Sequence, residues 1–322
     1  ALQVYPDCET LSCNAERDTE EATRKTSGVA YDQLFMRHWD HWLDRKLSRL
    51  FLLRFDQPGD AALLTGALEA DIPSRVWGGS EEYVVSGNGK TLYFTARLRD
   101  AKEPASTNFD IYAMPLDGRG KPKNLTAGNP AWDTQPRISP DGRQLAWLAM
   151  SRPGFEADQF QLVVRDLESS EQRILSGDWD YSPSGIEFSP DGRFIYLNAQ
   201  DTGHKTLWRV PVAGGKFERL AGDGSITSFQ VGEKELVFLR SHLKSPGELY
   251  RAAPDGSGEV QLTDFSGQSQ IPQRLLRRQD VRLSFRQRRV RIQNSGTGNR
   301  GASAAQSRNV LLLKFLFRQR PQ

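Results

Sequence analysis

The chain of 322 residues contains few of the residues from which metal and catalytic sites are usually built. It has two cysteines, Cys8 and Cys13, and four histidines. Structural zinc sites usually need four cysteine or histidine ligands, so without a second cysteine pair we expect no zinc site. We predict no other metal and no cofactor either. The longest apolar run, Leu311–Phe317, is interrupted by Lys314. It is far shorter than the 18 or so apolar residues of a membrane span, and we therefore expect no transmembrane helix.

The sequence also lacks a clear nucleophile motif. A serine hydrolase of the α/β type carries Gly-x-Ser-x-Gly, because small residues on both sides permit the strained turn that exposes the hydroxyl. The nearest match, Gly301–Ala305, lacks the second glycine, and no alternating strand–helix pattern surrounds it. His38 and His41 lie in an aromatic stretch, where we assign them to packing and hydrogen bonding rather than to metal binding. We predict no catalytic triad in this chain.

Acidic residues are almost absent from residues 271–322, where twelve arginines and one lysine face Asp280 alone. The whole chain has 43 basic and 40 acidic side chains, so residues 1–270 hold 30 basic and 39 acidic ones, a formal charge of −9. Two interpretations of the tail stay open. An arginine-rich arm can bind nucleic acid, but this one lacks interleaved aromatic residues. We favour translation of a shifted reading frame and expect a disordered or weakly structured tail with no nucleic-acid partner.

No signal segment opens the chain. The first residue is Ala1, and no basic-then-apolar stretch follows it, so either a leader has been removed or the chain is a fragment. Four residues separate Cys8 from Cys13. Two alternatives stay open for this pair: a small disulfide loop, which would indicate an oxidising compartment, or two isolated thiols.

A repeated phrase is the main positive signal. Ser139–Arg143 (SPDGR) recurs as Ser189–Arg193, with a degraded copy at Ser86–Lys90 and a weaker one at Val231–Lys234. Each copy runs into a strand-like stretch: Thr91–Thr95, Gln144–Leu148, Phe194–Leu197 and Glu235–Leu239. Asp-Gly and Asn-Gly between apolar runs predict tight hairpins, because glycine and asparagine tolerate a positive φ.

A second pattern repeats between these copies. It consists of a strand, a turn rich in Asp and Gly, a second strand and an exit resembling Leu-Thr-Gly. It occurs five times: Leu50–Gly66, Ile111–Gly128, Leu162–Gly177, Leu207–Gly222 and Leu249–Asp264. A repeat of roughly 40–55 residues fits four-stranded propeller blades. We predict an all-β fold, a partial β-propeller of about four to five four-stranded blades. The predicted domains are a propeller segment with a charged insert and the cysteine pair (1–48), the blades (49–270) and the aberrant tail (271–322).

Several longer stretches carry a family resemblance. They are Val4–Cys8, Tyr31–Asp40, Ser106–Tyr112, Asn129–Pro136, Arg152–Asp158 and Leu243–Tyr250. Together they resemble the propeller of bacterial dipeptidyl aminopeptidase/acylaminoacyl-peptidase-type enzymes, which belong to the prolyl oligopeptidase family of serine peptidases. The resemblance covers about residues 2–266 and stops at the tail.

The resemblance implies a propeller that caps a C-terminal α/β-hydrolase domain, with peptides reaching a Ser-Asp-His triad between the two. We expect that catalytic domain to be missing here. The chain is then the substrate-gating propeller portion of a serine exopeptidase acting on oligopeptides, inactive alone, although its enzyme status stays open. The full-length relative would be periplasmic or secreted, with peptides as its partners. The alternative is a free-standing TolB-like propeller module that binds protein or peptide.

Candidate binding residues precede the repeated strands, where strand starts would face the central channel or its mouth. Some relatives hold a substrate's α-ammonium with paired glutamates, which makes Glu81 and Glu82 candidates. The alternative is two solvated charges at a loop-to-strand junction. Four further candidates lie in the most family-like stretches and either shape the cavity wall or cap turns: Asn108, Asp110, Trp132 and Asp133.

Overall fold

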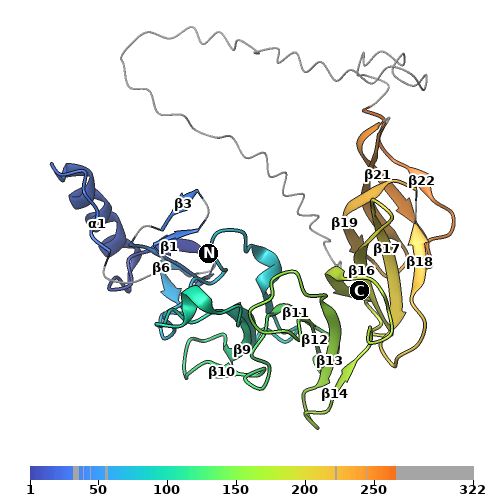
Figure 1. Cartoon of the computed structure of the whole chain (residues 1–322), viewed down its shortest axis with the longest axis horizontal. Coiled ribbons are helices and arrows are strands. Elements are labelled where there is room, and N and C mark those ends of the chain that lie inside the picture. Colours follow the sequence, from blue (N-terminus) through green and yellow to red (C-terminus); the bar gives the residue numbers. More distant parts are fainter. Residues whose placement is uncertain are drawn as a thin grey trace, which may run out of the picture. The chain divides into compact units, whose positions relative to one another are not determined.

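The computed structural model describes residues 1–31, 36–38, 40–43, 45–54, 57–221, 223–243 and 245–265. Most of the regular structure in these residues is β-strand, and most of the strands belong to four antiparallel sheets of four strands each (Figure 1). In each of these four sheets the strands that are consecutive in the chain are hydrogen-bonded neighbours. This is the strand order of a propeller blade, and the predicted all-β, blade-like fold is confirmed.

We number the four sheets I to IV along the chain. Sheet I contains β7 (Tyr83–Val85), β8 (Thr91–Ala96), β9 (Asp110–Pro115) and β10 (Lys123–Asn124). Sheet II contains β11 (Asp133–Ile138), β12 (Gln144–Ala149), β13 (Gln161–Asp166) and β14 (Gln172–Ile174). Sheet III contains β15 (Pro183–Phe188), β16 (Phe194–Asp201), β17 (His204–Pro211) and β18 (Glu218–Ala221). Sheet IV contains β19 (Ser225–Val231), β20 (Leu236–His242), β21 (Ser245–Ala252) and β22 (Val260–Gln261).

Shorter elements precede sheet I. The strands here are β1 (Leu2–Val4), β2 (Arg37–His38), β3 (His41–Trp42), β4 (Leu47–Arg49), β5 (Phe51–Arg54) and β6 (Gln57–Leu63). They pair as β1 with β4, β2 with β3 and β5 with β6. The β5–β6 pair is the first of the five outer hairpins that the sequence predicts. The one α-helix of the described residues is α1 (Leu11–Thr23), and two 3-10 turns, η1 (Ser80–Glu82) and η2 (Glu103–Ala105), lie further along.

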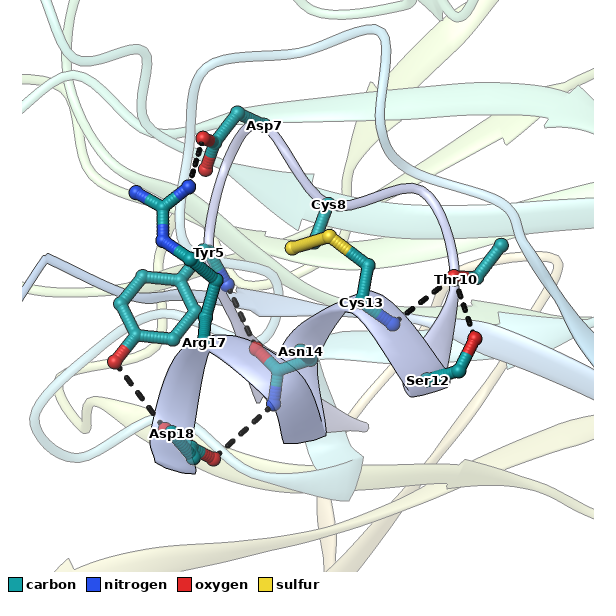
Figure 2. The surroundings of a disulfide bond; sticks show 9 residues. All are labelled: Tyr5, Asp7, Cys8, Thr10, Ser12, Cys13, Asn14, Arg17 and Asp18. Atoms are coloured by element: carbon teal, nitrogen blue, oxygen red, sulfur yellow. Dashed lines mark hydrogen bonds and ion pairs between the residues drawn. A yellow bond between two sulfur atoms is a disulfide. The ribbon is translucent and has the colours of Figure 1, made fainter. Parts of the chain in front are cut away.

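Helix α1 is attached by a disulfide and by polar contacts (Figure 2). Cys8 and Cys13 are joined by an S–S bond of 2.05 Å, which links the segment after β1 to the first turn of the helix. Thr10 caps that turn, because its Oγ1 accepts the N–H of Cys13 at 3.2 Å. Two polar pairs hold the same region together, Tyr5 N to Asn14 Oδ1 at 3.0 Å and Arg17 to Asp7 at 2.5 Å. No residue of α1 is buried, so the helix contributes little to the core.

The repeated turn is built from three side-chain interactions. Ser139 Oγ donates to Asp141 Oδ1 at 2.6 Å and accepts the N–H of Gln144 at 2.8 Å. The same Asp141 oxygen accepts the N–H of Arg143 at 3.0 Å, and Gly142 adopts a φ of 73°. Matching bonds form in the turns of Ser189–Phe194 and, with asparagine in place of aspartate, Ser86–Thr91. Serine, aspartate or asparagine, and glycine are therefore the residues that this turn requires.

The hydroxyl of the Leu-Thr-Gly-like exit closes the outer hairpin. Thr126 Oγ1 accepts the N–H of Ile111 at 2.9 Å, the first residue of the same repeat. The equivalent pairs are Thr65 with Leu50, Ser176 with Leu162, and Thr263 with Leu249, at 2.8–3.0 Å. Sheet III has Ala221 at this position, and there Ala221 pairs directly with Leu207 in the β17–β18 ladder.

The core lies between neighbouring sheets. Each full burial of a large apolar side chain is worth roughly 1.5–3 kcal/mol. Sheets I and II share Tyr93, Ile111, Leu145, Trp147 and Val163. Sheets II and III share Leu148, Leu162, Ile195 and Leu197, and sheets III and IV share Tyr196, Leu207, Leu236 and Phe238. This stacking brings the strand starts of successive sheets together at one end, where Asp133 N donates to Phe109 O at 2.8 Å.

The described residues all belong to one compact unit, Ala1–Ile271. The predicted tail (271–322) and the partial nucleophile motif at Gly301–Ala305 lie outside the described residues, so the three domain boundaries stay predictions. Within the described ranges, no helix combines the length and the apolar character needed to cross a membrane.

Candidate functional site at the starts of the first strands

A cavity of about 250 Å³ lies where the first strands of sheets I and II begin. Its wall comes from β2, from residues 74–78 and η1, from Arg97 after β8, from the loops that precede β9 and β13, and from the start of β11. Of the six candidate binding residues from the sequence, Glu81, Glu82 and Trp132 line this cavity. The other three lie nearby without lining it. The cavity therefore draws on segments that are up to 122 residues apart in the sequence, from His38 to Phe160.

Aromatic rings from both sheets form one wall of the cavity. The rings of Phe109 and Trp132 stack with their centroids 4.9 Å apart, and Phe160 meets Trp132 edge-on at 5.7 Å. The Arg97 guanidinium lies 4.8 Å from the Phe109 centroid. Such aromatic pairs contribute about 0.5–1.5 kcal/mol beyond their burial. The indole Nε1 of Trp132 is buried, and no residue in the described ranges accepts its hydrogen bond.

Glu81 and Glu82 have different environments although they are adjacent in η1. Glu82 is 4% exposed, and its carboxylate accepts the N–H of Ser74 at 2.6 Å and the Ser74 hydroxyl at 2.7 Å. Burial raises the pKa of Glu82, and the two bonds from Ser74 act in the opposite direction. Glu81 is half-buried, and its Oε1 accepts the N–H of Gly79 at 2.9 Å. Glu82 thus anchors the loop, whereas Glu81 presents its carboxylate to the cavity.

The loop before η1 passes very close to the Glu82 carboxylate. A Cβ at Gly78 would lie 2.4 Å from Ser74 Oγ and 2.5 Å from Glu82 Oε2. Real Cβ atoms do not approach oxygen so closely, so only glycine fits here. Gly78 N also donates to Ser74 O at 3.0 Å. The anchoring of this loop by Glu82 depends on that glycine.

Asp133 and Asp110 are buried in the packing between sheets I and II. Asp133 is 1% exposed, and it accepts hydrogen bonds from Trp147 Nε1 at 2.8 Å and from Asn129 Nδ2 at 3.1 Å. Burial raises its pKa to about 7, with a further contribution from the charge of Asp110, while the hydrogen bonds lower it. Burial also raises the pKa of Asp110, whose Oδ1 accepts from Thr126 Oγ1 at 3.3 Å. These contacts tie strand starts to their neighbours.

Asn108 joins two loops near the cavity. In the amide orientation that satisfies both of its ends, Asn108 donates to the carbonyls of Ala131 at 2.9 Å and Asn129 at 3.1 Å. These bonds hold the segment before β9 against the segment before β11. Asn108 thereby supports the positions of Phe109 and Trp132, the two stacked rings.

Gln135 is a cavity residue that the candidate list omits. It has a φ of 56°, a left-handed conformation that a residue with a Cβ rarely adopts. It lies at a bulge in β11, between the paired residues Thr134 and Arg137. The sequence offers no glycine or asparagine here to signal the bulge. The candidate list also omits the cavity residues Arg97, Phe109 and Phe160, because their role depends on loops that meet only in the fold.

Two half-buried charges, Arg137 and Glu187, lie on the consecutive first strands β11 and β15. Arg137 Nη1 donates to the carbonyl of Glu81 at 2.9 Å and so supports η1. Burial lowers the pKa of Arg137, while the charges of Glu187 and Glu81 raise it. Burial raises the pKa of Glu187 to about 7, against the opposing effects of the Val231 N–H and the Arg137 charge.

The site thus combines two accessible carboxylates, the half-buried Glu81 and the exposed Glu156, with an aromatic wall. Such a combination can bind a cationic group attached to an apolar body. In the part of the chain that the structure describes, no group of three or more His, Cys, Asp or Glu side chains could hold a metal ion.

The chain resembles a set of peptidases in sequence. It is 28% identical over 246 residues to dipeptidyl-peptidase 5 of Porphyromonas gingivalis, covering 74% of this chain and 35% of that protein. It is 30% identical over 254 residues to a probable dipeptidyl-peptidase 5 of Arthroderma benhamiae, covering 72% and 35%. The chain therefore spans about a third of the length of the curated relatives it matches. No family model matches it.

Solved structures show the same fold. A putative TolB from Agrobacterium tumefaciens has a TM-score of 0.50 at 20% identity, over 68% of this chain and 75% of that chain. A puromycin-hydrolyzing peptidase from Mycobacterium tuberculosis has a TM-score of 0.50 at 21% identity, over 67% and 35%. The predicted resemblance is confirmed: the chain is similar to the β-propeller part of peptidases of the prolyl oligopeptidase type.

Proposed function

We propose that this chain is the substrate-gating β-propeller portion of a serine exopeptidase that acts on oligopeptides, of the dipeptidyl- or acylaminoacyl-peptidase kind. The names of the sequence relatives support a role in peptide hydrolysis. The observation that carries the proposal is the cavity, where Glu81 lies beside the Phe109–Trp132 stack.

In the proposed complex, Glu81 pairs with the α-ammonium of a peptide. Its Oε1 already accepts from Gly79 N, and its Oε2 has no hydrogen-bond partner among the described residues and so is free to accept from an ammonium. Glu82 does not take this role, because Ser74 donates to both of its oxygens. Its part is to hold η1 and thereby to aim Glu81.

The aromatic wall then receives the first side chain of the peptide. Phe109, Trp132 and Phe160 offer apolar surface next to the carboxylate. Pockets for drug-sized ligands usually measure about 300–1,000 Å³, and this one is about 250 Å³. We therefore propose that only the first one or two residues of a peptide enter it.

Binding of peptides with free and blocked N-termini tests this role. Isothermal titration of the full chain would compare a tetrapeptide beginning with phenylalanine to its N-acetylated form. Because a hydrogen bond to a charged group is worth about 1.5–3 kcal/mol, we expect the free peptide to bind at least about tenfold more tightly. Glu81→Gln should abolish that preference, and Glu233→Gln, at an exposed glutamate of a distant turn, should keep it. Equal binding of both peptides to the wild-type chain would overturn the proposal.

We further propose that the chain alone binds peptides without hydrolysing them. A fluorogenic dipeptidyl substrate, followed together with labelling by a fluorophosphonate probe, tests this. Turnover that is lost on substituting a labelled serine would contradict it. The alternative is a free-standing TolB-like module, which the similarity of fold to a putative TolB supports. It predicts that peptide binding does not depend on a free N-terminus of the peptide.

A further inference from the structure

In the first copy of the SPDGR turn, the side chain of the arginine makes no hydrogen bond within the described residues. Arg143 contributes its backbone N–H to Asp141, and its exposed guanidinium makes no hydrogen bond or ion pair within the described residues. The serine, aspartate and glycine account for the turn. Besides hydrogen bonds, the Arg143 charge lowers the pKa of Asp141 and Asp166, but the donors of its guanidinium remain available for binding.

Arg143 lines a groove of about 660 Å³ between sheets II and III. The groove lies beyond the end of β11, whereas the peptide cavity lies at the start of that strand. Two more arginines line it, Arg193 from the second SPDGR copy and Arg173 from β14. Three guanidinium groups from two sheets therefore surround one groove, and the groove is separate from the proposed peptide site.

One oxygen of each carboxylate in the groove already accepts hydrogen bonds from the protein itself. Asp141 accepts from the Ser139 hydroxyl and from Arg143 N. Asp166 accepts from the N–H groups of Glu168 and Ser169 and from the Ser169 hydroxyl. These hydrogen bonds lower the pKa of both aspartates. They hold the Oδ1 atom of each carboxylate within its own turn, and none of them uses a guanidinium donor.

The arginines retain most of their donors. Arg173 uses one Nη2 bond, to Val212 O at 3.0 Å, and Arg193 bonds Asp191 through Nε at 2.6 Å while its side chain is 77% exposed. A guanidinium has five N–H donors in a planar fork that fits a carboxylate. The groove also contains apolar surface from Phe194, Pro211 and Val212.

We propose that this groove binds an acidic peptide segment in extended conformation. In an extended chain, alternate side chains point to opposite sides, so carboxylates would meet the arginines while apolar side chains contact Phe194, Pro211 and Val212. The groove volume lies within the range of ligand sites. A carboxylate suits the groove better than a phosphate dianion does, because Asp141 and Asp166 repel a second negative charge more strongly.

Residue-resolved modification of arginine tests the proposal on the full chain. The probe is a blocked hexapeptide of alternating glutamate and leucine, and its control has glutamine in place of glutamate. Phenylglyoxal modifies accessible guanidinium groups, and mass spectrometry reports the rate at each arginine. We expect the acidic peptide to slow modification of Arg143 and Arg173 by about threefold or more. Arg119, an exposed arginine outside the groove, should react at an unchanged rate.

Substitutions provide the second measurement. In fluorescence anisotropy with the labelled acidic peptide, Arg143→Gln should weaken binding about fivefold or more, and the charge-matched Arg119→Gln should change it less than about twofold. Equal losses in both variants, or protection of all arginines alike, would show non-specific attraction and overturn the proposal. The proposal would also be overturned if inorganic phosphate, added at the same total charge as the peptide, slowed the modification of Arg143 to the same extent.

Discussion

Gln135 Oε1 accepts a hydrogen bond from Gly185 N at 3.0 Å, and the two residues occupy equivalent positions in sheets II and III. Each lies at the bulge of its first strand, with a φ of 56° at Gln135 and 57° at Gly185. Gly185 adopts this conformation without penalty, whereas Gln135 is strained there. The side chain of Gln135 compensates for the strain by linking the two first strands beside the cavity.

Substitutions at Gln135 should separate the strain from the hydrogen bond. Gln135→Ala keeps the left-handed strain and loses the bond to Gly185 N, so we expect a loss of about 1 kcal/mol in the free energy of unfolding. Gln135→Gly loses the same bond but relieves about 1 kcal/mol of strain, so its stability should stay near that of the wild type. Urea denaturation measures both. A glycine variant less stable than the alanine variant would contradict the assignment of strain.

The serine of the repeated turn should contribute more to the stability of the fold than its small size suggests. Ser139 is 3% exposed and bonds both Asp141 and Gln144 N. Ser139→Ala removes both bonds and leaves a backbone N–H without a side-chain acceptor, so we expect a loss of about 1–2 kcal/mol in stability.

The matched control for Ser139 is Ser169→Ala. Ser169 makes similar bonds to Asp166 and to Glu171 N, but in an exposed turn. Water replaces such bonds at little cost, so the loss should stay below about 0.5 kcal/mol. Equal losses of stability in the two variants would show that burial does not increase the contribution of the Ser139 hydrogen bonds.

The blade architecture could be predicted because its signals are local and repeated. The turn of Ser139–Arg143 and the exit at Thr126 use contacts within one hairpin, so their residue types identify the hairpin directly. The order of strands within each sheet follows from the same signals, because neighbours in the chain pair in space. Helix α1 falls in the predicted charged insert, and it has no buried residue to give it an apolar pattern that would identify it as a helix.

The candidate site could be predicted only in part, because it depends on contacts between distant segments. Glu81 and Glu82 are equivalent in the sequence, and only the position of Ser74 makes Glu82 an anchor. The aromatic stack joins Phe109 to Trp132 through the packing of two sheets. Gln135 carries no residue-type signal for its bulge, since neither glycine nor asparagine occupies that position.

The half-buried Glu187 should make stability depend on pH near neutrality. Its pKa is about 7 against an ordinary value of 4.5, so the protonated carboxyl favours the folded state. The contribution is complete below about pH 4.5 and is lost as the pH rises to about 7. Glu187→Gln does not titrate. Between pH 5 and pH 8 it should therefore gain roughly 2–3 kcal/mol relative to the wild type.

Urea denaturation of both proteins at the two pH values measures this difference. Asp133, whose pKa is also raised to about 7, titrates in both proteins, so only the difference between them reports on Glu187. Glu168→Gln, at an exposed glutamate, should follow the wild type at both pH values. If the free energy of unfolding of Glu187→Gln differed from that of the wild type by the same amount at pH 5 and pH 8, the raised pKa of Glu187 would be ruled out.

The disulfide should hold helix α1 without supporting the sheets. Because no residue of α1 is buried, the helix depends on Cys8–Cys13 and on polar contacts such as Arg17 with Asp7. Exposed ion pairs contribute only about 0–1 kcal/mol, so Cys13→Ser should free the helix for local unfolding. We expect trypsin to cleave after Arg17 about tenfold faster in Cys13→Ser than in the wild type. The thermal midpoint of the sheets should change by less than about 2 °C.

Asp7→Asn, which removes only the ion pair, is the matched control and should raise the cleavage rate less than about threefold. A sheet transition that falls together with the helix would show that α1 belongs to the cooperative core, and an unchanged cleavage rate would show that the polar contacts suffice.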